Sequence, residues 1–527
     1  MKQLTQQQVQ QLMMLHQQGQ HDKVIQQASS LIQDYPKEFI LFNLLGVSLE
    51  KQGKLQEATV AYEKALKLNP NIPELQFNLG AMLYAQNRYE DAIQHYQKSI
   101  QLNAKFVEAY FNLGITYQTQ GNFEKAIDAY QQAITIQPGF YEAITNVGTI
   151  KQLQGELSEA IELFQKAIAI FEDAKGHYNL AGAFRNQGNL TLAISHFKRA
   201  IELGANEPDF YSDLGDALWH DGKIKEANNF LRLAVEKDPD HARANYQLAV
   251  FLYDNENYDE ARKHFMQSKF EDFQERSLYC LYKLKRFDEF YQQLQTLIPV
   301  KNNSPFLATL STHYAQNFNQ EDLYQFCPNP LNYVCHEKIP ELVANNYQLV
   351  KDLLHDIDTA DIAERKQSRL TFGIQSSGNL FRRQESSFQQ LADALRLMIK
   401  NYHRRFSNES CEFIQAFPKN IEFSSSWFVK MQKGGHLSSH IHEDGWISGA
   451  VYLSIPNQNA TLDEGAIELS THGDNYPKMH DNFPKKIILP AVGDVIFFPS
   501  SVFHRTIPFQ ADKERICIAF DLKPEVK

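Results

Sequence analysis

A short histidine-rich segment, HLSSHIHEDGW, contains the residue types that bind metal ions. His442 and Asp444 stand two residues apart in it. On a strand, residues i and i+2 point to the same face, so an imidazole and a carboxylate at this spacing can reach one metal ion. His504, which follows the strand-like segment DVIFFP, is the candidate third ligand. Two histidines and one carboxylate on one face of an octahedron leave three positions open, which is typical of non-haem Fe(II) oxygenases.

A further histidine of this segment, His440, is an alternative metal ligand. By strand parity His440, His442 and Asp444 share a face if no bulge intervenes, so spacing alone does not choose between them. The sequence therefore predicts a site made of His442, Asp444 and His504, with a set that uses His440 as the alternative.

The segments around these residues predict a β domain. After Phe406 the chain contains short stretches rich in β-branched and aromatic residues and bounded by Gly, Pro, Asn and Asp. These stretches are SSSWFVKMQ, WISGAVYLSIP, AIELST, KIILP, DVIFFP and RICIAFDLK. Several short strands at modest spacing favour a jelly roll, or double-stranded β-helix. Residues 387–404 have the apolar spacing of a helix that flanks it.

The first 300 residues follow a period of 34. Small residues recur at this spacing at Gly46, Gly80, Gly114 and Gly148, and nearly in step at Ala181, Gly215 and Ala249. Small residues at fixed points let two paired helices approach closely, and we expect the aromatic residues Tyr62, Tyr96 and Tyr130 to fill the gap to the next pair. With one weaker unit at each end, the period predicts an all-α solenoid of about eight to nine helix pairs over residues 1–300.

A row of amides follows the same period. Two residues before the small position the chain carries Asn78, Asn112, Asn146 and Asn179. An amide donates and accepts hydrogen bonds at once, so such a row in the solenoid groove could hold the backbone of an extended peptide. The competing interpretation is that Asn serves helix packing here.

Composition narrows the function classes. The chain has 527 residues, and 63 Asp and Glu against 52 Lys and Arg give a formal net charge of -11 at pH 7, which excludes a general attraction to nucleic acid or anionic membranes. The five cysteines contain no C-x-x-C pair, which argues against a disulfide framework or a zinc knuckle. No apolar run approaches the roughly 18 residues of a membrane span. We expect a cytoplasmic protein that binds neither nucleic acid nor membrane.

The first half resembles the tetratricopeptide repeat, whose pattern the segment FNLGITYQTQGNFEKAIDAYQQAI matches closely. Residues 345–527 resemble the 2-oxoglutarate and Fe(II)-dependent oxygenases, through the ordered set of H-x-D, a Gly-Asp turn, a distal histidine and Arg515. The domain order is then a solenoid at 1–300, a connector at 301–344 and a jelly roll at 345–527.

The second resemblance implies the cofactors. Fe(II) would be held by the metal ligands, 2-oxoglutarate would chelate it as cosubstrate, and O2 would be the oxidant. In such enzymes a basic residue on a late strand pairs with the distal carboxylate of 2-oxoglutarate, and Arg515 matches that position. Relatives often carry a hydroxyl two residues further on, where this chain has Cys517, so Tyr452 is the candidate for the helper hydrogen bond.

The expected function is a dioxygenase that hydroxylates a side chain of a protein or peptide captured by the solenoid. Three alternatives stay open: a non-catalytic repeat scaffold with a vestigial metal-binding jelly roll, a small-molecule hydroxylase, and a cupin-like metalloenzyme. Gly434, His440 and His442 fit the first cupin motif, but its glutamate is missing and Arg515 has no role in that scheme.

Overall fold

The computed structural model describes residues 4–270, 272–300, 303–360, 362, 364–365, 369–376, 378–443, 445–456 and 463–523. The chain forms two compact units, one of residues 1–150 with 162–172 and one of residues 151–161 with 173–527. Across the described ranges, no helix has both the length and the apolar character that crossing a membrane requires.

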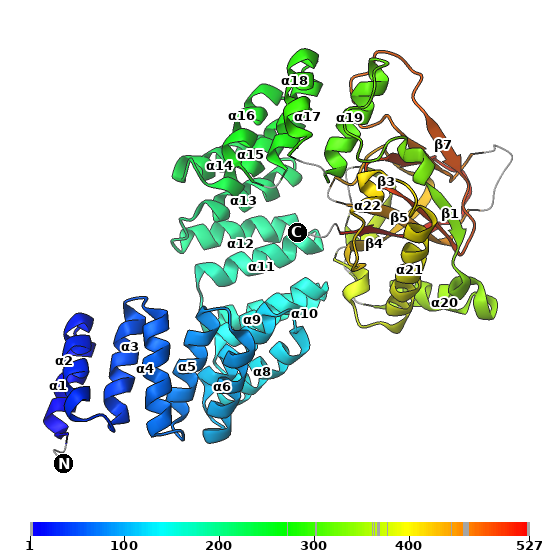
Figure 1. Cartoon of the computed structure of the whole chain (residues 1–527). Helices are drawn as coiled ribbons and strands as arrows, with labels where there is room; N and C mark the ends of the chain where they lie inside the picture. Colours follow the sequence, from blue (N-terminus) through cyan, green and yellow to red (C-terminus); the bar gives the residue numbers. More distant parts are fainter. Residues whose placement is uncertain are drawn as a thin grey trace. The chain divides into compact units, whose positions relative to one another are not determined.

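Consecutive helices pair within each unit, as the 34-residue period predicts (Figure 1). In the first unit they are α1 (Gln6–Gln17), α2 (His21–Asp34), α3 (Phe39–Lys51), α4 (Leu55–Leu68), α5 (Pro73–Ala85), α6 (Tyr89–Leu102), α7 (Val107–Thr119) and α8 (Phe123–Ile136). In the second unit they are α11 (Ala174–Gln187), α12 (Leu190–Glu202), α13 (Pro208–His220), α14 (Ile224–Lys237), α15 (Ala242–Asp254), α16 (Tyr258–Ser268), α17 (Phe273–Lys283) and α18 (Phe287–Leu297). Two further helices, α9 (Tyr141–Gln154) and α10 (Leu157–Ile170), each have residues in both units.

Glycine ends the first helix of several pairs. Gly53 and Gly121 have φ values of 73° and 74°, a left-handed conformation that glycine adopts without steric cost. This turn directs the chain back along the helix it has just left, so the two helices of a pair lie antiparallel.

The aromatic residues of the repeat contact both their own pair and the next. The rings of Tyr62, Tyr96 and Tyr130 lie over the small glycine of their own pair, so a Cβ atom on Gly114 would be 2.6 Å from the Tyr130 ring. The side chains of Tyr96 and Tyr130 also reach the next pair, where they form hydrogen bonds with Asn112 and Asn146. These two rings therefore fill the hollow left by a helical glycine and also bridge to the next pair, as predicted.

The second unit continues with the remaining elements. The helices are α19 (Pro305–Asn317), η1 (Pro330–Tyr333), α20 (Pro340–Thr359), η2 (Leu380–Arg382), α21 (Ser386–Arg405) and α22 (Glu412–Gln415). The strands are β1 (Cys335–Lys338), β2 (Glu364–Arg365), β3 (Leu370–Ser376), β4 (Phe423–Leu437), β5 (Ile447–Ser454), β6 (Ile467–Ser470), β7 (Lys485–Ile488), β8 (Asp494–Pro499), β9 (Phe503–Thr506) and β10 (Arg515–Leu522).

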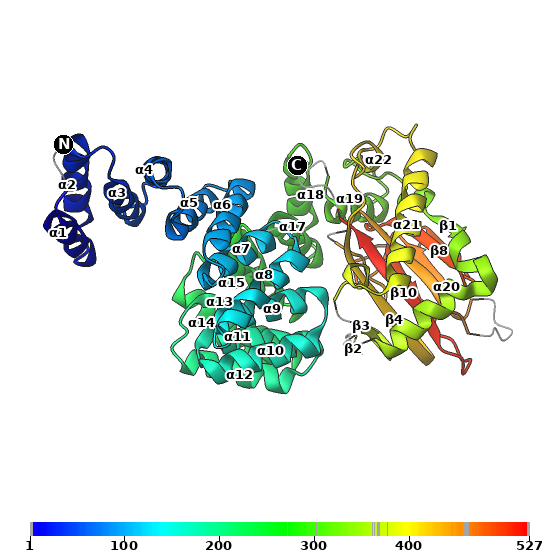
Figure 2. The same ribbon diagram turned by 90° about the horizontal axis from the view of Figure 1, so that it is seen from below.

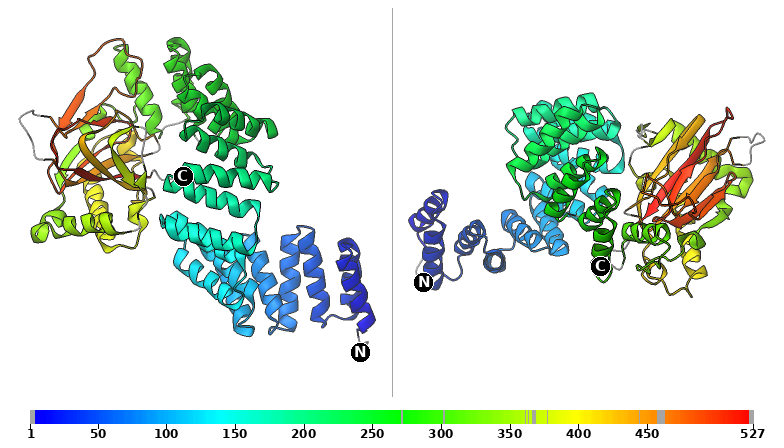
Figure 3. Two further views of the ribbon diagram at one scale, coloured as in Figure 1. Left: turned by 180° about the vertical axis from the view of Figure 1, so that it is seen from behind. Right: turned by 90° about the horizontal axis from the view of Figure 1, so that it is seen from above.

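The strands form two antiparallel sheets, in the order β1-β8-β5-β10-β4-β3-β2 and β7-β6-β9. Figure 2 shows the large sheet with α20 and α21 beside it, and Figure 3 shows the same strands from two further sides. Alternation along β10 separates two environments. Ile518 and Phe520 join the core shared with α20 and α21, whereas Cys517 packs with residues of the small sheet such as Ile467 and Leu469. The double-stranded β fold that the sequence predicts is therefore confirmed, with helices on one face of the large sheet.

The last helices of the solenoid share this core. Leu278 and Tyr282 of α17 belong to the same buried cluster as α19 and the large sheet. On α19, the Thr309 hydroxyl donates to the Ser501 carbonyl at 2.9 Å. Strand β1 lies within the segment predicted as a connector and pairs with β8, so this segment contributes to the sheet.

Candidate metal centre and cosubstrate cavity

Three histidines converge between the two sheets. The candidate ligand nitrogens of His440, His442 and His504 all lie within 4.8 Å of one another. His440 and His504 form an antiparallel bridge, in which each backbone N–H donates to the other's carbonyl at 3.1 Å and 2.9 Å. His442 follows in the loop after β4, where its N–H donates to the Ser500 carbonyl. Backbone pairing, rather than one continuous strand, therefore brings the three side chains together.

Hydrogen bonds orient each imidazole. Nδ1 of His440 faces the Ser438 carbonyl at 2.8 Å, and Nδ1 of His504 faces the Val502 carbonyl at 3.4 Å. A carbonyl only accepts, so both Nδ1 atoms carry the proton and both Nε2 atoms are left as acceptors. Nε2 of His440 lies 3.3 Å from Nε2 of His442. Acceptor nitrogens this close repel unless a cation stands between them, so the donor set fits a metal ion.

Asp521 fixes the third imidazole. Its Oδ1 lies 2.5 Å from Nδ1 of His442 and accepts from the Ser448 hydroxyl at 2.7 Å, and its Oδ2 accepts from the Ser425 hydroxyl at 2.9 Å. Burial opposes ionisation of Asp521, yet the attraction of His442 and these hydrogen bonds hold its pKa below the usual range. A buried carboxylate behind a metal-binding histidine keeps the free nitrogen directed at the metal and raises its basicity.

The other two histidines are held neutral. Burial, with His442 nearby, lowers the pKa of His440 to about 3. Burial, with His440 and His442 nearby, lowers the pKa of His504 well below its usual value. A metal ion binds the neutral imidazole, so no proton has to leave these two side chains at neutral pH.

Arg515 occupies the deep end of the same cavity. Its side chain is 2% exposed, and its contacts are the Gly465 carbonyl at 3.2 Å and the sulfur atoms of Met431 and Cys517. None of its partners in the described ranges is an anion. The guanidinium carbon lies 5.0 Å from the ring centre of Tyr452, whose buried hydroxyl has no acceptor for its proton within those ranges.

This arrangement fits an anionic ligand. A buried cation without a carboxylate partner is costly, and a buried hydroxyl whose proton has no acceptor adds to the cost. A carboxylate that accepts hydrogen bonds from both groups removes both penalties, as the distal carboxylate of 2-oxoglutarate would.

The cavity that joins these groups has a volume of about 550 Å³. Alternate residues of the large sheet line it, among them Trp427 of β4, Tyr452 of β5 and Ala519 of β10. The ring of Trp427 lies 5.5 Å from that of His442. Trp446, by contrast, is buried in the core, where its indole N–H donates to the Phe413 carbonyl.

The remaining predicted site residues are less defined. Asp444 lies outside the described residues. Asn78, Asn112 and Asn146 are half-buried on α5, α7 and α9 of the first unit, and Asn179 is half-buried on α11 of the second. Asn112 and Asn146 form side-chain hydrogen bonds with Tyr96 and Tyr130 of the preceding pair. These two amides therefore have a packing role, and the peptide-binding role stays a prediction.

Sequence reasoning missed two features. The first is Asp521, which is 79 residues from His442 and is brought to it only by the pairing of β10 with β4 and β5. In the sequence, the only sign of its role is its position in the alternating pattern of RICIAFDLK.

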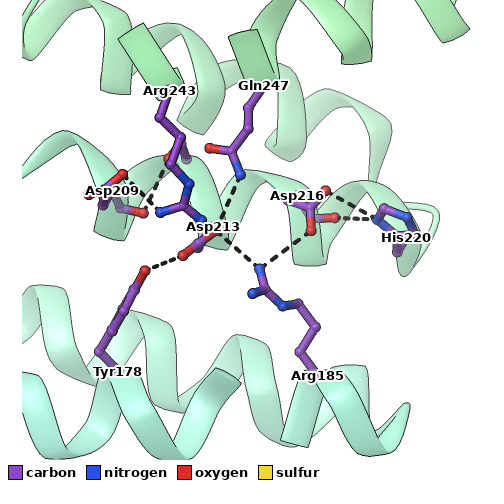
Figure 4. A network of polar contacts seen from close by, with 9 residues as sticks. Tyr178, Arg185, Asp209, Asp213, Asp216, His220, Arg243 and Gln247 are labelled. Atoms are coloured by element: carbon purple, nitrogen blue, oxygen red, sulfur yellow. Dashed lines mark hydrogen bonds and ion pairs between the residues drawn. The ribbon is translucent and has the colours of Figure 1, made fainter. Parts of the chain in front are cut away.

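The second feature is a polar network on α11, α13 and α15 (Figure 4). In it, Asp213 accepts from Arg243 at 2.7 Å and from Arg185 at 3.1 Å, with Tyr178 and Gln247 as further donors.

The comparisons with known families divide the chain in two. Residues 425–521 match a family described as "Putative 2OG-Fe(II) oxygenase". Tetratricopeptide-repeat families match residues 46–86, 80–121, 107–140, 151–208 and 218–279. No curated protein matches the chain.

Several solved structures are similar to parts of the chain. MamA is 28% identical, over 30% of this chain and 92% of its own, with a TM-score of 0.29. YrrB, described as a TPR protein with an unusual peptide-binding site, is 24% identical over 36% of this chain and 97% of its own, with a TM-score of 0.30. A tetratricopeptide repeat protein from Parabacteroides merdae ATCC 43184 is 16% identical over 47% of this chain and 98% of its own, with a TM-score of 0.40.

Proposed function

This chain carries tetratricopeptide repeats ahead of a segment that matches the "Putative 2OG-Fe(II) oxygenase" family, and from that premise we propose that it is an Fe(II)- and 2-oxoglutarate-dependent dioxygenase. Its substrate in this proposal is a side chain of a protein or peptide captured by the repeats. The observation that carries the proposal is the buried Arg515, without an anionic partner in the described ranges, in the same cavity as three convergent histidines.

His442, His504 and His440 would hold Fe(II) through Nε2, with Asp444 as the alternative to His440. Arg515 and Tyr452 would hold the distal carboxylate of 2-oxoglutarate. When bound, Fe(II) and 2-oxoglutarate let O2 oxidise a C–H bond: one oxygen atom enters the product alcohol, the other enters succinate, and CO2 leaves.

The chain's own residues position these reactants. Asp521 keeps Nε2 of His442 directed into the cavity, because its Oδ1 accepts from Nδ1. Arg515 and Tyr452 orient the cosubstrate, and Val429, Ile467 and Phe498 keep water from that part of the cavity. Catalysis by such a site depends on groups that are in place before the reaction.

The repeats would supply the protein interaction. Tetratricopeptide repeats present a groove lined by the first helix of each pair, and Asn78, Asn112, Asn146 and Asn179 are the candidate contacts to a peptide backbone. Helices α15 and α17 also line the 550 Å³ cavity, through Val250, Tyr253 and Tyr279. Because the last pairs share a wall with the metal centre, a polypeptide held by them can present a side chain to it.

The decisive test is succinate formation from 2-oxoglutarate by anaerobically purified protein that is given Fe(II) and then air. Turnover without substrate is slow in such enzymes, so we expect a weak signal that His504→Ala abolishes. We expect Arg515→Ala to raise the 2-oxoglutarate concentration needed for half-maximal rate. The matched controls are His436→Ala and Arg505→Ala, because His436 lies outside the three-histidine group and Arg505 is an exposed partner of Glu468.

Wild-type protein that neither forms succinate nor binds 2-oxoglutarate with Fe(II) present would refute the enzyme and favour a repeat scaffold. Loss of turnover in both control variants to the same degree as in His504→Ala and Arg515→Ala would also contradict the assignment, because it would reflect a general loss of folding.

A further inference from the structure

The mouth of the cavity is built jointly by the repeats and the β fold. Tyr253 and Asp254 come from the end of α15, and Arg276 and Tyr279 come from α17. Arg369, Glu443 and Asp474 come from segments of the β fold and line the same space. A substrate that reaches the histidines must therefore pass side chains of the last repeats.

Both cations at the mouth already have carboxylate partners. Arg276 pairs with Glu443 and also with Asp272, whose Oδ2 is 3.0 Å from Nε. Arg369 pairs with Asp474 at 3.4 Å. Neither guanidinium is left to attract an anionic substrate.

One carboxylate is in excess. Asp254 is exposed and forms no direct ion pair or hydrogen bond with any described residue, and burial of its carboxyl on the cavity side raises its pKa although Arg369 and Arg276 act against that rise from further away. At the mouth, away from Asp521 and Arg515, three lining carboxylates (Asp254, Glu443 and Asp474) accompany the two guanidinium groups of Arg276 and Arg369. The mouth therefore carries a net negative charge, opposite in sign to the Arg515 end.

Asp254 also lies on a helix face that leads to the cavity. Arg243, Gln247, Val250 and Asp254 follow the spacing of one face of α15. Arg243 and Gln247 donate hydrogen bonds to Asp213 in the network of Figure 4, where Arg243 and Arg185 balance the charge of this carboxylate. At the cavity end of the same face, no described cation bonds Asp254 directly, and the two arginines that act on its charge, Arg369 and Arg276, are each paired with another carboxylate.

We propose that the mouth binds a cationic side chain, lysine or arginine, of the substrate polypeptide, with its charge at Asp254 while Arg515 holds the carboxylate of 2-oxoglutarate. The inference rests on the proposed function and specifies its substrate class. Opposite charges at the two ends keep the two ligands apart, because each end repels the ligand of the other. An acidic side chain would meet the carboxylates of the mouth, and a neutral one would gain nothing from Asp254.

The test uses the full chain and synthetic Gly-Ser peptides with one central residue: Lys, Arg, norleucine, citrulline or Glu. Binding is measured by fluorescence anisotropy of labelled peptides with Ni(II) and 2-oxoglutarate present, and turnover by succinate formation with Fe(II). We expect the Lys or Arg peptide to bind about tenfold more tightly than its neutral counterpart and to stimulate succinate formation. Free lysine, as a separate arm, distinguishes a small cation from a polypeptide side chain.

Three variants test whether the preference for a cationic peptide depends on Asp254. Asp254→Asn removes the charge and should abolish the difference between charged and neutral peptides, and Asp254→Lys should favour the Glu peptide. Glu236→Gln removes one exposed negative charge on α14, outside the cavity lining, and should keep the wild-type preference. Peptide-free succinate formation should be the same in Glu236→Gln as in the wild type.

Equal binding of charged and neutral peptides, absence of any peptide binding, a preference that survives in Asp254→Asn, or tighter binding of free lysine than of the Lys peptide would each overturn the inference. If the inference fails in any of these ways but the wild type still forms succinate without peptide, the dioxygenase proposal stands. If peptide-free turnover is absent while the cationic preference is present, the dioxygenase proposal fails and the cation site remains.

Discussion

At the residue scale, the chemistry of the cavity depends on which nitrogen of each histidine faces it. Nδ1 of His440 and of His504 each donates a hydrogen bond to a backbone carbonyl, and Nδ1 of His442 donates one to the Asp521 carboxylate. In a neutral imidazole with Nδ1 bonded in this way, Nε2 is the nitrogen that can bind a metal ion. In a set of three histidines the negative charge comes from Asp521, which is not a ligand itself but is hydrogen-bonded to Nδ1 of the ligand His442.

The ligand set can be decided by metal binding. We expect His440→Ala to weaken Co(II) binding by more than about 100-fold, because even outer partners of a ligand contribute about 10- to 100-fold. Asp444→Ala should bind Co(II) like the wild type. Equilibrium titration followed by the Co(II) absorption bands measures both. The opposite pattern, with binding lost in Asp444→Ala and kept in His440→Ala, would restore the set of His442, Asp444 and His504.

A second residue-scale prediction concerns Asp521. Asp521→Asn keeps the shape but removes the charge behind His442, so Co(II) affinity should fall by about 10- to 100-fold and the Co(II) bands should shift. Ser424→Ala is the matched control, because its hydroxyl meets only the backbone carbonyl of Asp521. An unchanged Co(II) spectrum and affinity in Asp521→Asn would show that the carboxylate serves the fold alone.

At the element scale, the alternation of strands distributes the functional residues. Arg515, Cys517, Ala519 and Asp521 of β10 line the cavity, while the residues between them pack toward the helices. Hydrophobic pattern therefore predicts which face of a strand carries chemistry. It does not predict β1 and β9, which are short and gain their stability from pairing with β8 and β6.

The solenoid glycines provide an element-scale prediction. A Cβ atom on Gly114 would lie 2.6 Å from the Tyr130 ring, so Gly114→Ala should lower the free energy of unfolding by about 1–3 kcal/mol, although alanine favours a helix by about 1 kcal/mol. Urea denaturation followed by circular dichroism measures this.

Gly139→Ala is the control for this prediction, because no atom lies within 4 Å of the added Cβ. Equal stability of the two variants would mean that the Tyr130 ring moves aside without cost.

At the scale of the whole molecule, the two compact units differ in what they contain. The first holds repeat helices only, and the second joins the later repeats to the β fold. In the second, α17 and α19 share one buried cluster with the large sheet. The last repeats are therefore part of the body that carries the three convergent histidines.

This organisation predicts two thermal transitions, of which ligands affect one. Ni(II) with 2-oxoglutarate at about 100 times Kd should stabilise the second unit by about 2.7 kcal/mol, because the ligands bind only its folded state. Differential scanning calorimetry should show one transition that moves and one that does not, and His504→Ala should remove the shift. A shift of both transitions would show that the units unfold together.

The sequence alone determined the features that depend on local spacing. The period of 34 predicts the helix pairs, and the H-x-D segment, the distal histidine and Arg515 predict the chemistry, because each is read from residues close in the chain or from the order of motifs. Tertiary structure alone brought His440 to His504, Asp521 to His442, and α15 and α17 to the cavity. Strand pairing and core packing join residues that are far apart in sequence, and no local pattern records such contacts.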